Sequence, residues 1–111
     1  MILRLWHGWA RPQDAAAYQQ LLTQQIAPGI ASARLSGLHD LTVLRRDGSE
    51  LRAGDDVEFL TLMSFHDLEA VREFTGGEPS RSVVPPAARQ LLRQHDEYSQ
   101  HYVRLASYPG A

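Results

Sequence analysis

The segment Asp56–Phe74 carries the clearest pattern of hydrophobic and polar positions in the chain. Its first part alternates as a strand does, with large side chains on both sides. One side holds Phe59, Thr61, Met63 and Phe65, and the other holds Leu60, Leu62 and Ser64. Asp67 then suits the N-cap of a helix in which Leu68, Val71 and Phe74 share one face. Because both sides of the strand are apolar, both faces of its sheet need cover.

The rest of the pattern predicts three further strands, at Ile2–Ala10, Leu38–Arg46 and Tyr98–Ala106. A helix is expected from Pro12, because Tyr18, Leu21, Leu22 and Ile26 recur at helical spacing. Pro28-Gly29 is expected to stop this helix, and Gly76-Gly77 to end the next one. The polar loop Asp47–Asp56 predicts a long hairpin connection. Pro85-Pro86 is expected to start a short helix that carries Leu91 and Leu92.

This order of elements is β-α-β-β-α-β, with the short helix added before the last strand. It predicts a ferredoxin-like α+β fold, in which a four-stranded antiparallel sheet has both helices on one face. We expect a single domain over residues 1–106 and a flexible tail over residues 107–111.

The leucines of the first strand suggest which face the helices cover. If Leu3 and Leu5 face the helices, Arg4 and Trp6 point to the uncovered side. By the same reasoning Phe59, Thr61, Met63 and Phe65 lie on the uncovered side of the third strand. Such an apolar face predicts a symmetric dimer that buries it, with the functional space between the two sheets.

Composition excludes several classes of function. The net charge of −2 gives no broad positive field for nucleic acid, and no apolar run approaches the length of a membrane helix. We expect a cytoplasmic protein with no nucleic-acid or membrane partner.

The chain has no Cys, which excludes disulfides, thiolate catalysis and cysteine-held metal. All 11 basic residues are Arg, so no lysine Schiff base forms, and Asn is absent as well.

The order of elements, the segment Arg4–Gly8 followed by Arg11-Pro12, and the strand–helix segment Glu58–Phe74 resemble the antibiotic biosynthesis monooxygenase family. The resemblance covers nearly the whole chain. It implies a dimeric α+β barrel, in which two sheets pack face to face and each subunit keeps a pocket between its sheet and its helices. It also implies oxygen chemistry without a bound metal or flavin, so no cofactor is expected.

The family's known catalytic residues do not carry over to this chain. Members that oxidise phenolic polycyclic substrates place an asparagine and a tryptophan on the third strand, where this chain has Thr61 and Phe65. The haem-degrading branch uses an asparagine on the first strand, a tryptophan near the end of the third strand and a histidine on the second helix. The chain has no Asn, no Trp after Trp9, and no His between Leu68 and Gly77.

Two residues of the first strand are candidates for ligand contacts. Arg4 lies on an otherwise apolar strand, so it needs either a carboxylate partner or an anionic ligand. Glu58, or an acid of a dimer partner, is one candidate for that carboxylate. Trp6 is expected either to wall a pocket for a flat ring or to pack in the dimer core, and it lies on the opposite face from Trp9.

His101 and Tyr102 lie on the predicted last strand, near the expected pocket. A neutral histidine is suited to take a proton from a phenol-type substrate, although a structural role is also open. The five histidines show no spacing typical of a metal site.

These observations predict a small cofactor-independent monooxygenase acting on a flat aromatic or quinol-type molecule. His101 and Arg4 are the predicted catalytic residues. Trp6, Phe59, Thr61, Met63, Phe65 and Tyr102 are the predicted substrate-binding residues. The alternative is a non-oxidative binding protein, or a cyclase or isomerase, on the same barrel.

Overall fold

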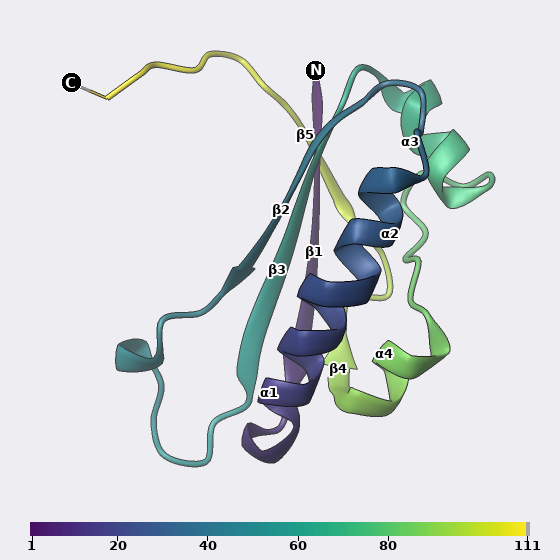
Figure 1. The fold of residues 1–111 in the computed structure, drawn as a ribbon. Helices are drawn as coiled ribbons and strands as arrows, with labels where there is room; N and C mark the ends of the chain where they lie inside the picture. Colours follow the sequence, from purple (N-terminus) through teal and green to yellow (C-terminus); the bar gives the residue numbers. More distant parts are fainter. Residues whose placement is uncertain (111) are drawn as a thin grey trace.

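In the computed structural model, which describes residues 1–110, five antiparallel strands form one sheet with helices along one of its faces (Figure 1). The strands are β1 (Ile2–Ala10), β2 (Leu38–Arg45), β3 (Val57–Phe65), β4 (Leu92–His95) and β5 (Gln100–Val103). The α-helices are α1 (Pro12–Leu21), α2 (Ala27–Ser32), α3 (Leu68–Thr75) and α4 (Pro86–Leu91). A π-helical turn, η1 (Leu22–Ile26), joins α1 to α2, and a 3-10 turn, η2 (Gly48–Glu50), lies in the β2–β3 connection.

The predicted last strand, Tyr98–Ala106, is observed only as the shorter β5, and β4 is an additional strand that was not predicted. The sheet therefore has five strands where four were expected. The sheet order is β2-β3-β1, and both β4 and β5 pair with the free edge of β1. Gly8 lies opposite His95 and Leu5 opposite Gln100, so the four residues 96–99 face only Trp6 and His7. These extra residues do not pair with β1 and separate β4 from β5. Leu92, expected in a helix, begins β4.

The first helical segment is longer than predicted, because Pro28-Gly29 does not stop it. The backbone N–H of Ala27 donates to the carbonyl of Leu22, five residues earlier. This wider turn comes just before Pro28, where an ordinary α-helix would bring the proline ring against a carbonyl. The chain therefore stays helical to Ser32.

The helix after β3 is confirmed. The Asp67 carboxylate accepts a hydrogen bond from the N–H of Ala70 at 2.9 Å, and Gly76 ends the helix with a φ of 82°. Residues 104–110 belong to no helix or strand, and Ala111, the last residue of the predicted tail, lies outside the described residues.

The helices cover the opposite face of the sheet from the one predicted. Phe59 packs edge-on against Tyr18 of α1, and Phe65 packs against Phe74 of α3. Arg4 and Trp6 lie on this same covered face, and Leu3, Leu5, Leu60 and Leu62 lie on the open one. The prediction was wrong because both sides of β1 and β3 are apolar. The aromatic side of β3, rather than the leucine side of β1, decides which face packs against the helices.

Candidate active site between the sheet and the helices

A cavity lies between the covered face of the sheet and the helices. Arg4, Trp6, Leu41, Val43, Thr61 and Met63 of the strands line one side. Tyr18, Leu22, Ile26, Ala27, Ile30, Phe74, Val83, Val84, Pro85 and Ala88 line the other. The space open to water-sized molecules is about 50 Å³. A buried water needs roughly 10–15 Å³ by this measure, so the cavity has room for only a few waters.

Arg4 is the most unusual group at this cavity, because it is buried without an acidic partner. Its side chain is 3% exposed. Nη1 donates to the carbonyl of Pro79, and Nη2 donates to the carbonyl of Arg81 at 2.7 Å. Among residues 1–110, no carboxylate oxygen lies within 4.0 Å of its guanidinium. Burial lowers the pKa of Arg4 to about 10, so the side chain still carries its positive charge at neutral pH.

His101 lies next to Arg4 and shares a hydrogen bond with it. Arg4 Nη1 lies 3.1 Å from His101 Nε2. Since the guanidinium has only donors, Nε2 is the acceptor and the ring proton sits on Nδ1. Burial, and to a smaller extent the charge of Arg4, lower the pKa of His101. The histidine is therefore neutral at pH 7, and its basic nitrogen is occupied by Arg4.

Trp6 is fixed in one orientation as a wall of the cavity. Its indole N–H donates to the Ser82 hydroxyl at 2.9 Å and to the Asp96 carbonyl at 3.0 Å. Gly8, the next residue on this face of β1, leaves room for the ring. A Cβ at Gly8 would lie 3.2 Å from the indole. The cavity is thus bordered by a preorganised flat surface next to a buried cation.

The structure brings together only part of the predicted site. Arg4, Trp6, Thr61 and Met63 line the cavity, and His101 stands beside Arg4 without lining it. Phe59 and Phe65 are buried beneath α1 and α3 and do not line it. Tyr102 is opposite Leu3 on the open face of the sheet and is 54% exposed.

The helical side of the cavity and the backbone groups that hold Arg4 were not among the predicted site residues. The helical spacing of Tyr18, Leu22 and Ile26 was the available signal for the helical side. Burial raises the pKa of Tyr18 to about 12, so this residue keeps its hydroxyl proton at neutral pH. The carbonyls of Pro79 and Arg81 leave no trace in a sequence pattern, because every residue has a carbonyl.

An apolar groove on the surface adjoins the cavity. It has a volume of about 300 Å³ and is lined by Ile26, Gly29, Ile30, Ala33, Leu35, Phe74, Val83 and Pro85. Five of these residues also line the cavity, namely Ile26, Ile30, Phe74, Val83 and Pro85. The cavity and the groove are therefore separated by no more than these shared side chains.

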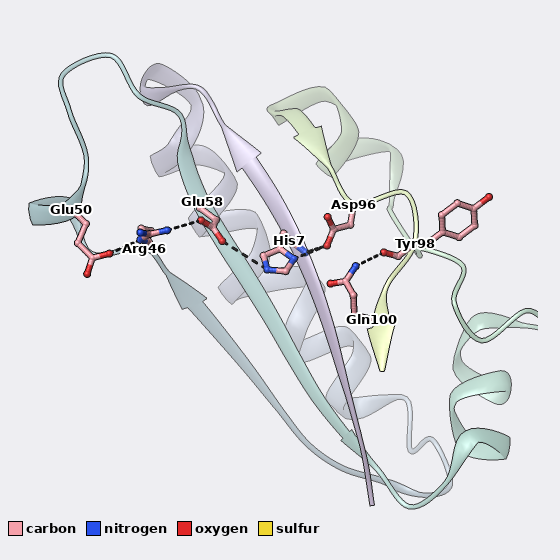
Figure 2. A network of polar contacts seen from close by, with 7 residues as sticks. All are labelled: His7, Arg46, Glu50, Glu58, Asp96, Tyr98 and Gln100. Atoms are coloured by element: carbon pink, nitrogen blue, oxygen red, sulfur yellow. Dashed lines mark hydrogen bonds and ion pairs between the residues drawn. The ribbon is translucent and has the colours of Figure 1, made fainter. Parts of the chain in front are cut away.

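Glu58, one predicted partner of Arg4, belongs instead to a polar network on the open face of the sheet (Figure 2). Its carboxylate lies 3.2 Å from Arg46 Nη1 and 3.9 Å from His7 Nε2. His7 Nδ1 is in turn 2.6 Å from the Asp96 carboxylate. Strand alternation explains this position, since Glu58 has opposite parity to Phe59 and therefore faces away from Arg4.

Within residues 1–110, no group of three or more His, Asp or Glu side chains is placed to hold a metal ion. No helix in this part of the chain has the length and apolar character needed to cross a bilayer.

Comparison with solved structures shows which fold the chain shares. No protein-family model and no curated protein sequence matches the chain. The crystal structure of a Bacillus cereus protein, described as a “putative antibiotic biosynthesis monooxygenase”, superposes with a TM-score of 0.67 at 17% sequence identity. The match covers 98% of this chain and 97% of that one. The chain therefore shares the fold of that protein over nearly its whole length. This confirms the predicted α+β fold and, at the level of the fold, the resemblance to the antibiotic biosynthesis monooxygenases.

Proposed function

We propose that the chain is a small monooxygenase-like enzyme that needs no cofactor and acts on a flat, quinol-type aromatic molecule in the cavity between sheet and helices. The observation that carries the proposal is Arg4, a buried cation without a carboxylate partner at the end of a largely apolar cavity. A fixed positive charge in a dry site stabilises an anion much more strongly than it would in water.

In this proposal the substrate is oxidised as an anion. A ring CH₂ group conjugated with a carbonyl, as in the keto form of a quinol-type ring, loses a proton to solvent, and Arg4 stabilises the resulting negative charge. Molecular oxygen then reacts with the electron-rich carbon. One oxygen atom becomes a carbonyl of the product, and the other leaves as water with the two hydrogens of the CH₂ group. The CH₂ carbon supplies all four electrons that reduce the two oxygen atoms, so no further reductant is required.

The cavity must widen before it can hold a ring system. Ligand pockets usually measure about 300–1,000 Å³, whereas this cavity measures about 50 Å³. A ring system therefore enters by displacing the shared wall towards the surface groove. Phe74 and Val83 are part of that wall. Trp6, held by its two hydrogen bonds, then provides the surface on which the ring stacks.

We assign to His101 a positioning role. Its Nε2 accepts from Arg4, so it takes a proton from a substrate only after the guanidinium has moved. While this hydrogen bond is present, His101 holds one side of the guanidinium in position and does not neutralise its charge. His101→Ala is then expected to lower activity through a misplaced Arg4.

The test is oxygen uptake with quinols and anthrone-like compounds, with no cofactor added. We expect uptake that depends on the protein, and a product that carries one labelled atom when ¹⁸O₂ is used. His101→Ala should lower the rate, and heat-denatured protein serves as the control. No uptake with any of these compounds would contradict the proposal.

The second candidate is a non-oxidative binding protein, cyclase or isomerase on the same fold. The occupied Nε2 of His101 favours the binding protein, because the cavity then lacks a free histidine base. A product without the ¹⁸O label would support this candidate over oxygenation.

We also propose a homodimer formed through the open face of the sheet. In Figure 1 the helices α1 to α4 lie to one side of the sheet. Strand parity places Leu3, Leu5, Trp9, Leu60 and Leu62 on the other face, together with the polar network of His7 and Glu58. Leu44 and Tyr102 on this face are 45% and 54% exposed. A second copy of the same face is its most economical cover, because a two-fold axis makes the surface complementary to itself.

A further inference from the structure

The hydrogen bonds that join Arg4 to residues 79–81 do not explain why the side chain at this position is charged. The carbonyls of Pro79 and Arg81 and the Nε2 of His101 are all neutral acceptors. A neutral donor would serve them without the cost of burying a charge. What the arginine adds is an uncompensated positive charge, 3% exposed, at the wall of a cavity.

The cavity next to this charge has some polar side chains, whereas the adjoining surface groove is apolar. Arg4, Trp6, Tyr18 and Thr61 are the cavity residues with polar side-chain groups. The adjoining groove has none among its eight lining residues. Phe74 belongs to both linings, and its ring centroid lies 5.4 Å from Cζ of Arg4. The buried cation and the apolar groove on the surface therefore lie on either side of a wall to which Phe74 belongs.

We infer that the ligand of this site is an aromatic acid, ionised at neutral pH, whose carboxylate binds Arg4 and whose apolar body extends past Phe74 into the groove. The inference rests on the cavity assigned above as the substrate site, and it deepens that proposal by naming the class of ligand. It does not depend on oxygen chemistry. A planar carboxylate matches the guanidinium fork, and a neutral molecule of the same shape leaves the charge uncompensated.

The experiment compares 2-naphthoate with 2-naphthamide, which have the same rings and differ in the charge of the head group. Isothermal titration calorimetry at pH 7.5 measures both. We expect the carboxylate to bind about 10- to 100-fold more tightly, the range for a hydrogen bond to a charged group. Equal affinities, or no binding of either compound, would overturn the inference without any variant.

Variants locate the preference. Arg4→Gln should bring the two affinities close together. Arg46→Gln, which removes the same formal charge from the network on the open face, should leave the ratio unchanged. Circular dichroism checks the folding of both variants. A preference that survives Arg4→Gln, or that falls equally in Arg46→Gln, would contradict a specific role for Arg4.

A third variant tests the groove. Val83 is 45% exposed and lines both cavity and groove, so Val83→Trp fills the groove at a position that tolerates bulk. We expect weaker binding of both compounds by about 10-fold or more, and unchanged binding would overturn the placement of the rings. Carboxylate preference without oxygen uptake would refute only the monooxygenase proposal. Turnover of neutral substrates without this preference would refute only the present inference.

Discussion

Phe65→Ala is expected to lower the free energy of unfolding by about 3–5 kcal/mol, the range for removing a buried aromatic side chain. Phe65 is 0% exposed, and its ring centroid lies 6.0 Å from that of Phe74. It belongs to the core cluster with Met63, Ala70 and Val71. Truncation removes this buried surface and leaves a cavity between β3 and α3. Urea denaturation followed by circular dichroism measures the loss.

The matched control is Leu105→Ala, which removes an apolar side chain that is 94% exposed. A change within about 0.5 kcal/mol is expected there. Small domains are stable by about 5–15 kcal/mol, so the Phe65 variant loses a large share of its stability. A loss below about 1 kcal/mol would show that Phe65 lies on the uncovered face, as the leucine pattern alone suggested.

Leu62→Arg is expected to convert the proposed dimer into a monomer at micromolar concentration. Leu62 lies on the open face of β3, with Leu5 of β1 on one side and Thr42 of β2 on the other. In a symmetric dimer the substitution places two unpaired charges in one apolar interface, which costs several kcal/mol by desolvation. The protomer keeps its fold, because this face does not pack against the helices.

Sedimentation velocity on the wild-type protein, Leu62→Arg and Gln20→Arg provides the measurement. Gln20 is exposed on α1, so Gln20→Arg adds the same charge away from the open face and should leave a dimer intact. A wild-type protein that sediments as a monomer at micromolar concentration would refute the dimer. A Leu62→Arg variant that remains dimeric would place the interface elsewhere.

The sequence predicted most elements because local signals determined them. Alternation placed β1 and β2 within a residue of their observed ends and β3 in the first part of Asp56–Phe74. Asp67 and Gly76 marked the limits of α3. The sequence did not predict β4, and it made the last strand longer than β5, because both strands depend on pairing with one long edge of β1. Nor did it predict the helix through Pro28, which depends on a π-turn whose hydrogen bond has no sequence signature.

The candidate site was predicted in part, for a physical reason. Arg4 and Trp6 were found because a charge and an indole are conspicuous on an apolar strand. The face they occupy was wrong, since alternation gives parity without saying which side the helices cover. The sequence left undecided whether Arg4 has an acidic partner. Glu58 lies on the neighbouring strand, but its side chain is on the opposite face.

The anchoring of an acidic ligand by Arg4 is tested most directly by a crystal structure of the protein with 6-bromo-2-naphthoate. We expect the carboxylate about 2.7–2.9 Å from the guanidinium nitrogens, the usual length of a charge-assisted bond. The anomalous signal of bromine should lie in the groove beside Ile30 and Val83. A carboxylate bound outside the cavity, with Arg4 still contacting only Pro79, Arg81 and His101, would contradict this assignment.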